Sequence, residues 1–255
     1  MSNKTELRLI AEFKNRACFT RAELLDFFRS AEPELTEGTL GWRIHVLKNK
    51  NIIKSVKRGL YVISNQPEYM PAVSPDLLKI ARQLKEKYDE VKHCIWETTW
   101  LNEFSRHQPG KSTILIEIEK GFEESLFYEL KDSMRREVFL NPDEKVIDFY
   151  VAESNRPVIV KRLLTRAPLS KRTDKKVIFY IPTLEKMLVD LFAEERLFYH
   201  LQGSELVYIF ENAITRYTIN FTRLLSYAKR RERQQEIKQF LTNHMYHLVK
   251  GIIVD

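Results

Sequence analysis

Residues 20–64 carry the pattern that most constrains the fold of this chain. Thr20 and Glu23 have the spacing of a capping box, in which each side chain bonds the backbone N–H of the other residue at the start of a helix. Leu24, Leu25, Phe27 and Phe28 follow and give this helix an apolar side, and a turn then leads to Thr36. Because threonine is a good helix N-cap, the sequence predicts two short helices separated by a turn.

The second predicted helix runs from Thr36 to about residue 49 and has one apolar side. Leu40, Ile44 and Leu47 recur at i, i+4 and i+7, which is the spacing of a buried helix face. We therefore expect the opposite side to face solvent. That side carries Gly38, Trp42, His45, Val46 and Asn49, with Thr39 and Arg43 on its flanks.

Two short β-rich runs, residues 52–56 and 60–64, follow the second helix. They are joined by Lys57, Arg58 and Gly59, a basic hairpin tip with glycine where positive φ is favoured. Helix, turn, helix and hairpin in this order predict a winged helix-turn-helix. In such a domain the second helix is expected to read DNA.

The predicted DNA-binding segment also holds most of the positive charge. Residues 1–65 contain 12 Lys and Arg against 7 Asp and Glu, a net charge of +5, whereas the whole chain carries +7. Basic side chains neutralise phosphates and release counterions, which supplies affinity for nucleic acid without sequence preference. The alternative is a small helical domain whose basic face is simply solvated, but pattern and charge together favour DNA binding.

Several side chains have expected roles at DNA. Arg43 is expected to read a guanine edge, because a guanidinium bonds O6 and N7 together. Thr36 and Thr39 lie at a helix N-terminus, which favours phosphate. Trp42 is expected to pack under the hairpin rather than touch a sugar or a thymine methyl. The hairpin-tip cations suit phosphate or minor-groove contact, or form an ordinary exposed turn. The candidate DNA-binding set is Thr20, Arg21, Thr36, Thr39, Trp42, Arg43, His45, Lys48, Lys57 and Arg58.

The remainder of the chain predicts a second domain. Residues 66–75 contain three prolines and indicate a linker between domains at 1–65 and 76–255. Strands are expected at 93–96, 113–119, 137–140, 158–163 and 177–181, and helices at 76–90, 98–104, 121–132, 184–192, 205–216, 220–231 and 233–250. The predicted class is α+β, with an N-terminal winged helix-turn-helix followed by a mixed α/β domain that ends in a helical bundle.

Several short motifs resemble catalytic sites but lack their spacing. Residues 110–113 resemble the end of a P-loop without its first glycine. Glu117 and Glu119 resemble a metal-nuclease strand, in which an acidic residue and a lysine lie two positions apart and point to the same face. Lys120 is not two positions from either glutamate, so both glutamates are expected on the solvent face of an edge strand. No alternating carboxylate pair, as Mg²⁺ would require, follows Ser204.

The remaining metal-ligand residue types are scattered. His244 and His247 are expected on a helix surface, and Cys18 and Cys94 lie far apart. The sequence therefore predicts no metal site, no cofactor and no enzymatic activity, although a catalytic triad assembled from distant residues stays open.

Two basic clusters lie outside the predicted DNA-binding domain. Lys171, Arg172, Lys175 and Lys176 surround a predicted loop, and residues 229–233 join two predicted helices. A solvated face with cations near a helix C-terminus is one interpretation. Contact with phosphate, an acidic partner or RNA is the other. We take the first cluster as the candidate partner-binding site.

Residues 19–63, which end in Lys57-Arg58-Gly59-Leu60-Tyr61-Val62-Ile63, resemble the N-terminal winged helix of AbiEi-type antitoxins. Residues 181–191, including Glu185 and Asp190, resemble the opening of that family's C-terminal helical region, and residues 213–228 also fit. The middle of the chain matches by layout alone. The resemblance implies a repressor that binds double-stranded DNA at its own promoter in a bacterial toxin–antitoxin operon. It also implies a C-terminal domain that counters a nucleotidyltransferase-like toxin, through the toxin itself or its RNA substrate.

Composition limits the alternatives. No apolar run approaches the roughly 18 residues of a membrane span, and residues 1–16 show no signal-peptide core. Together with two distant cysteines, this favours a cytoplasmic location and no membrane partner. Two other functions stay open: a winged-helix regulator with a ligand-sensing domain, and a nucleic-acid-processing enzyme.

Overall fold

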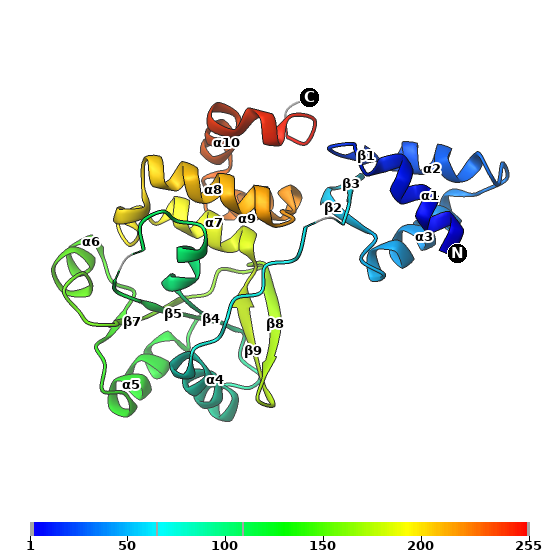
Figure 1. Cartoon of the computed structure of the whole chain (residues 1–255). Coiled ribbons are helices and arrows are strands. Elements are labelled where there is room, and N and C mark those ends of the chain that lie inside the picture. Colours follow the sequence, from blue (N-terminus) through cyan, green and yellow to red (C-terminus); the bar gives the residue numbers. More distant parts are fainter. Residues whose placement is uncertain (1–2, 65, 109, 254–255) are drawn as a thin grey trace.

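The computed structural model describes residues 3–64, 66–108 and 110–253. It is a mixed α and β structure, which confirms the predicted α+β class. An N-terminal part ending near residue 63 lies to one side of a larger part that contains the rest of the described chain (Figure 1). The buried apolar side chains form one cluster in each part, except that Val56 of the N-terminal hairpin belongs to the cluster of the larger part.

The N-terminal part combines three helices with a small antiparallel sheet. In chain order it contains α1 (Asn3–Phe13), β1 (Phe19–Thr20), α2 (Arg21–Arg29), α3 (Glu37–Asn49), β2 (Ile53–Lys57) and β3 (Leu60–Ile63). The strand order is β1-β3-β2. The expected capping box is confirmed, because Thr20 and Glu23 each bond the backbone N–H of the other residue. The expected buried face of α3 is also confirmed, with Leu40, Ile44 and Leu47 at most 6% exposed.

A four-stranded mixed sheet forms the middle of the larger part. It contains β4 (His93–Glu97), β5 (Ile114–Ile118), β6 (Val138–Leu140) and β7 (Val158–Arg162), in the order β4-β5-β7-β6. Strand β4 is antiparallel to β5, while β5 and β6 both run parallel to β7. Helices α4 (Pro75–Lys87) and α5 (Glu123–Ser133) lie on one side of this sheet, and α7 (Leu184–Ala193) and α8 (Ser204–Arg216) lie on the other (Figure 1). These four strands match the predicted runs, and the 3₁₀ helix η1 (Thr98–Glu103) matches the predicted helix after β4.

A second hairpin corrects one prediction. The basic residues 171–176 were expected on a loop, but β8 (Leu169–Asp174) pairs antiparallel with β9 (Val177–Pro182). Lys175 and Lys176 form the turn with φ of 45° and 67°. The pattern of β8 gives no apolar alternation because much of the strand faces solvent, whereas Phe179 and Ile181 of β9 are buried. A short helical segment, α6 (Glu144–Val146) with the π-helix η2 (Ile147–Val151), was also missed.

The end of the chain is helical, as the apolar periodicity predicts. It contains α7 (Leu184–Ala193), the 3₁₀ helix η3 (Tyr199–Leu201), α8 (Ser204–Arg216), α9 (Phe221–Arg230) and α10 (Gln234–Val249). Helix α10 is kinked at Met245, whose φ is −135°. None of the helices in the described ranges combines the length and the apolar character of a membrane span.

The predicted linker is fastened to the larger part over its described residues. Tyr69 Oη donates to the carbonyl oxygen of Trp100 at 2.9 Å, and Trp100 Nε1 donates to Ala72 O at 2.9 Å. Thr218 Oγ1 donates to Gln66 O at 3.3 Å. These bonds fix the path of the segment that joins the two parts.

Candidate nucleic-acid interface

Helix α3 presents a polar and aromatic outer face. Thr36 caps its N-terminus by accepting a hydrogen bond from the Thr39 N–H at 3.3 Å. The buried side described above fixes the rotation of the helix, so the opposite side faces solvent. Trp42, His45 and Asn49 are exposed there, and Lys48 is exposed on the flank that borders the larger part. We call these four residues the α3 outer face.

Trp42 corrects an expectation. The indole was expected to pack beneath the hairpin, but the residue is 59% exposed. One turn further along, His45 Nε2 and Asn49 Nδ2 lie 2.9 Å apart and form a hydrogen bond. An exposed tryptophan beside amide and imidazole groups is a surface that can meet base edges and a thymine methyl.

Arg43 does not project from the α3 outer face. Its Nη2 lies 2.6 Å from Glu32 Oε2, and its guanidinium lies 4.8 Å from the centroid of the Phe28 ring. The side chain is only 14% exposed. Arg43 therefore fastens the turn between α2 and α3, and the expected role in reading guanine does not fit this position.

Arg21 and the capping threonines likewise serve the local fold. Arg21 Nη2 lies 2.8 Å from Glu37 Oε2, which joins the starts of α2 and α3. The Thr20 N–H donates to Glu23 at 2.7 Å, and this bond helps to lower the pKa of the Glu23 carboxyl below its ordinary value. Thr36 Oγ1 and Thr39 Oγ1 are 3.0 Å apart and form a hydrogen bond. These groups position α3 at its N-terminal end.

The hairpin tip faces the larger part of the molecule through its backbone. Lys57 and Arg58 are exposed, as predicted. The Arg58 N–H donates to Thr222 Oγ1 at 2.9 Å. Two residues before Lys57, the carbonyl oxygen of Ser55 accepts from Asn220 Nδ2 at 3.1 Å. The start of α9 therefore holds the hairpin at two backbone positions, Ser55 and Arg58. The tip is not an isolated arm, although the side chains of Lys57 and Arg58 face solvent.

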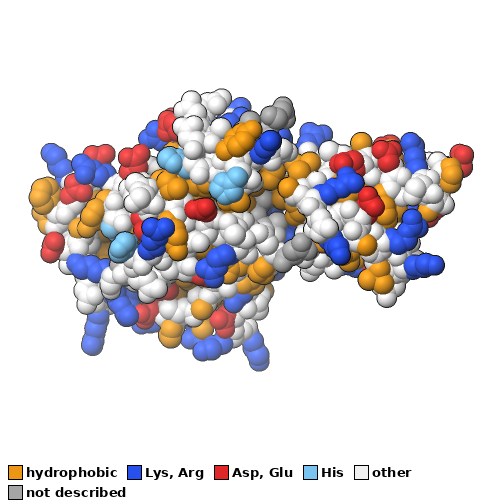
Figure 2. Space-filling model, turned by 45° about the horizontal axis from the view of Figure 1, so that its top comes forward, with side chains coloured by type: hydrophobic (Ala, Val, Ile, Leu, Met, Phe, Trp, Pro, Cys, Tyr) orange, Lys and Arg blue, Asp and Glu red, His pale blue; other side chains and the backbone are white. Residues whose placement is uncertain are grey.

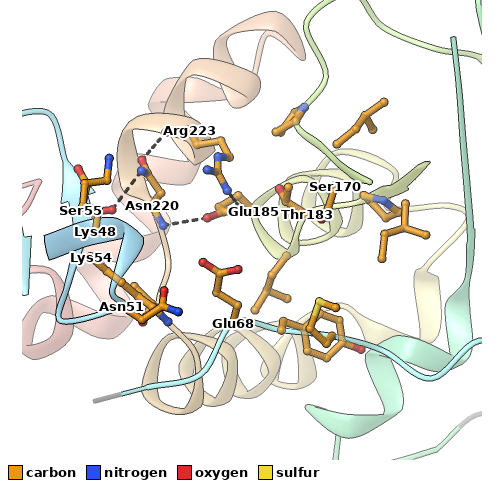
Figure 3. A pocket seen from close by; sticks show the side chains of 18 of the residues that line it. Lys48, Asn51, Lys54, Ser55, Glu68, Ser170, Thr183, Glu185, Asn220 and Arg223 are labelled. Atoms are coloured by element: carbon orange, nitrogen blue, oxygen red, sulfur yellow. Dashed lines mark hydrogen bonds and ion pairs between the residues drawn. The ribbon is translucent and has the colours of Figure 1, made fainter. Parts of the chain in front are cut away.

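A polar cavity of about 400 Å³ lies where the two parts meet (Figure 3). Lys48 and Lys54 line it from the N-terminal part, and Glu185 and Arg223 line it from the larger part. Glu185 Oε1 accepts from the Asn220 N–H at 2.9 Å, and Glu185 Oε2 lies 3.4 Å from Arg223 Nη1. Glu185 thus anchors the same segment that holds the hairpin tip.

The β8–β9 hairpin carries the candidate partner-binding cluster. Lys171, Lys175 and Lys176 are exposed, whereas Arg172 is half-buried and its Nη1 lies 3.9 Å from the sulfur of Met70. Lys171 is paired across the strands with Tyr180, which is 39% exposed. The cluster therefore lies on a face of the hairpin that combines the lysines of β8 and the turn with exposed side chains of β9.

A buried ionic network was missed by sequence reasoning. Lys186 of α7 is fully buried and lies 2.5 Å from both Glu117 Oε1 and Asp190 Oδ2. Asp190 also accepts from Tyr227 Oη at 2.9 Å. Burial opposes the charge on Lys186, but Asp190 and Glu117 outweigh it and raise the pKa of the ammonium above its ordinary value. Arg231, 3.6 Å from Asp190, extends the network towards the surface.

This network overturns the expected position of Glu117. The strand β5 lies between β4 and β7, so it is not an edge strand, and Glu117 is only 8% exposed. Glu119 lies beyond the strand and is exposed, as expected. No spacing signal could reveal the buried pair, because Glu117 and Lys186 are 69 residues apart.

The other motifs do not assemble into a metal centre. Across the described ranges, no cluster of three His, Cys, Asp or Glu side chains has the arrangement to hold a metal ion. His244 and His247 are exposed on α10, as expected for surface histidines. Cys94 is buried and Cys18 is half-buried, and both are free thiols.

The chain belongs to the family DUF6577, which is described as a family of unknown function, because the profile of that family matches residues 39–247. No curated protein matches the chain. The match begins inside α3 and reaches into α10, so it includes the α3 outer face, the β8–β9 hairpin and the buried network.

Proposed function

We propose that this member of the DUF6577 family binds double-stranded DNA through the α3 outer face and represses transcription from its own promoter. The single observation that carries the proposal is the exposed side of α3, where Trp42, His45, Lys48 and Asn49 face solvent on a helix fixed by a buried opposite side. A helix of this kind fits the major groove, in which side-chain amides and apolar groups distinguish base pairs.

The order of elements supports a winged helix. Three helices, a two-residue strand and a hairpin follow one another as α1, β1, α2, α3, β2 and β3, with all three strands in one antiparallel sheet. In winged-helix domains the third helix enters the groove and the hairpin flanks it. Here the hairpin tip also contacts α9, so we expect its Lys57 and Arg58 side chains to reach only phosphates beside the groove.

The charge distribution indicates which part of the affinity for DNA is non-specific and which part depends on sequence. On the face shown in Figure 2, Lys and Arg side chains of the N-terminal part, at the right, are interspersed with Asp and Glu. The net charge of +5 over residues 1–65 supplies a non-specific attraction that weakens with salt. Sequence preference would come from the α3 outer face, because phosphate contacts carry no direct information about sequence.

Selection from a pool of randomised duplexes tests this proposal. The full chain is incubated with the pool at about 150 mM salt, near physiological ionic strength, and bound duplexes are recovered and sequenced over several rounds. We expect one motif to be enriched and to occur upstream of the chain's own gene. Enrichment of no motif, or of single strands only, contradicts sequence-specific duplex binding.

A second function, neutralisation of a toxin, is supported by the resemblance to AbiEi-type antitoxins and by the β8–β9 hairpin. Two residues that carry this resemblance, Glu185 and Asp190, are 4% exposed and bond neighbouring elements. They support a shared architecture for the C-terminal region rather than a contact surface. The surface is supplied by the hairpin face with Lys171 and Tyr180, which suits an acidic protein or RNA.

Co-expression separates these two functions. We expect a toxic neighbouring gene product to be countered by the full chain and by Trp42→Ala, but not by Lys171→Glu with Lys176→Glu. Protection that is lost with Trp42→Ala and retained with both charge reversals would assign protection to repression alone. We propose no enzymatic activity for the chain; turnover of nucleotides, DNA or RNA that is abolished by Glu117→Gln in folded protein would contradict this.

A further inference from the structure

A second cavity, of about 280 Å³, opens on the larger part at the start of two parallel strands. Its lining comes from η1, the segment before β5, η2 with the residues that follow it, and the segment around η3. Thr113 and Pro157, which precede β5 and β7, both line it. The cavity is slightly smaller than the pockets that hold drug-sized ligands, so it suits a molecule with about one ring.

The interior of this cavity is mainly apolar. Ile147 and Val151 of η2 line it, and Leu197 lines it from the segment before η3. Burying a ring or short hydrocarbon chain against such side chains is favourable, because it removes apolar surface from water. The walls therefore favour a ligand with an apolar body.

The lining holds basic side chains and no acidic ones. Lys111 and Arg196 line the cavity together with the imidazoles of His107 and His200, and its described lining contains no Asp or Glu. Lys111 Nζ donates to Ala152 O at 2.6 Å, which leaves two of its protons available.

Carboxylates already lie beside two of these bases. Arg196 lies 3.8 Å from both Glu144 and Asp148, and His107 Nδ1 lies 3.3 Å from Glu205 Oε2. Lys111 forms no ion pair within the described part of the chain, so its ammonium remains open to an anion from solvent.

We propose that this cavity binds a small aromatic carboxylate, with its ring between Ile147, Val151 and Leu197 and its carboxylate towards Lys111. Lysine and arginine bond carboxylates through charge-assisted hydrogen bonds, which are about twice as strong as neutral ones. The site is separate from the α3 outer face, so ligand binding there does not depend on DNA binding by α3.

Ligand-observed NMR on the full chain tests the proposal with four probes. Benzoate and 4-hydroxybenzoate represent the expected class, benzamide is the neutral analogue, and benzylamine carries the opposite charge. We expect benzoate to bind about tenfold more tightly than benzamide and benzylamine, because only benzoate forms an ion pair with Lys111. Equal affinity for benzoate and benzylamine overturns the proposal.

Two variants locate the binding. Gly110 lines the cavity, and a Cβ added there meets no atom within 4 Å, so Gly110→Trp can obstruct the mouth without disturbing the fold. It should abolish benzoate binding. Lys111→Gln should weaken benzoate about tenfold and leave benzamide unchanged, and Lys79→Gln on α4 serves as the matched control. Benzoate binding that survives both Gly110→Trp and Lys111→Gln overturns the assignment to this cavity.

Discussion

Lys186 Nζ and Asp190 Oδ2 lie 2.5 Å apart on successive turns of α7, at a point where the lysine has no exposed surface. Glu117 approaches the same ammonium from β5, so the sheet and α7 are joined through one buried cation. Such a cation is stable only while its carboxylate partners remain in place, because each buried charge without a partner carries a desolvation cost of several kcal/mol.

The first prediction follows from this relationship. Lys186→Met should lower the free energy of unfolding by about 3–5 kcal/mol, since it leaves two buried carboxylates without a cation. Denaturant unfolding measures the loss. Lys85→Met on α4, which removes an exposed pair with Asp89, is the control and should change stability by less than about 1 kcal/mol. If Lys186→Met folds with a loss no greater than the control, the network does not join β5 to α7.

Arg43 gives the second prediction. Arg43→Ala removes the contacts with Glu32 and Phe28, so it should lower the free energy of unfolding by about 1 kcal/mol. We expect the preferred DNA sequence to stay the same. Comparing the motifs that the two proteins select from randomised duplexes checks this. Loss of preference at one base pair with unchanged stability would restore Arg43 as a base-reading residue.

Asn220 gives the third prediction, because it links the hairpin to α9. Its side chain accepts from the Arg223 N–H at 3.0 Å as an N-cap and donates to Ser55 O. Asn220→Ala should cost about 1 kcal/mol of stability and raise hydrogen exchange in β2 and β3. Asn243→Ala, at an exposed position on α10, is the control. Unchanged exchange in both strands would show that the hairpin does not depend on this contact.

Glu205 gives a prediction about pH. Burial opposes ionisation of its carboxyl, but the N–H groups of His107 and Arg106 bond the carboxylate and lower its pKa. A carboxyl with a lowered pKa in the folded state stabilises the fold at neutral pH, and this contribution is lost as the pH falls through that pKa. Glu205→Gln should therefore be less stable than the original chain at pH 7, with a smaller difference near pH 3. Urea unfolding at both pH values measures the two differences, and a difference that grows on acidification contradicts the account.

The elements with regular spacing were predictable from sequence. The Thr20 capping box and the apolar spacing of Leu40, Ile44 and Leu47 depend on residues within one or two turns of each other, so local pattern is enough. The strand β8 was missed because Lys171 and Thr173 face solvent beside only half-buried neighbours, which leaves no alternation to detect. Local reasoning succeeds where burial is one-sided and fails where a strand is largely exposed.

The candidate interface shows the same limit at the level of single side chains. Helical geometry placed Arg43 on the flank of α3, but its pairing with Glu32, 11 residues earlier, depends on how the turn folds. Trp42 was expected on the side of α3 away from the core but packed beneath the hairpin, yet its position opposite Leu40 and Ile44 leaves it in solvent. Side-chain direction was predictable from the helix, whereas side-chain partners were not.

The most direct test of the central claim is the affinity of the full chain for duplex DNA from upstream of its own gene, measured by fluorescence anisotropy with Trp42→Ala and with Tyr128→Ala. Both aromatic side chains are largely exposed, at 59% and 61%, but only Trp42 belongs to the α3 outer face, whereas Tyr128 lies on α5. The account predicts that Trp42→Ala weakens specific binding about tenfold or more and leaves binding to unrelated duplex unchanged, because only the specific complex places α3 against base edges. Tyr128→Ala should bind both duplexes as the original chain does. Equal affinity of the two variants for the upstream duplex would contradict DNA recognition by α3.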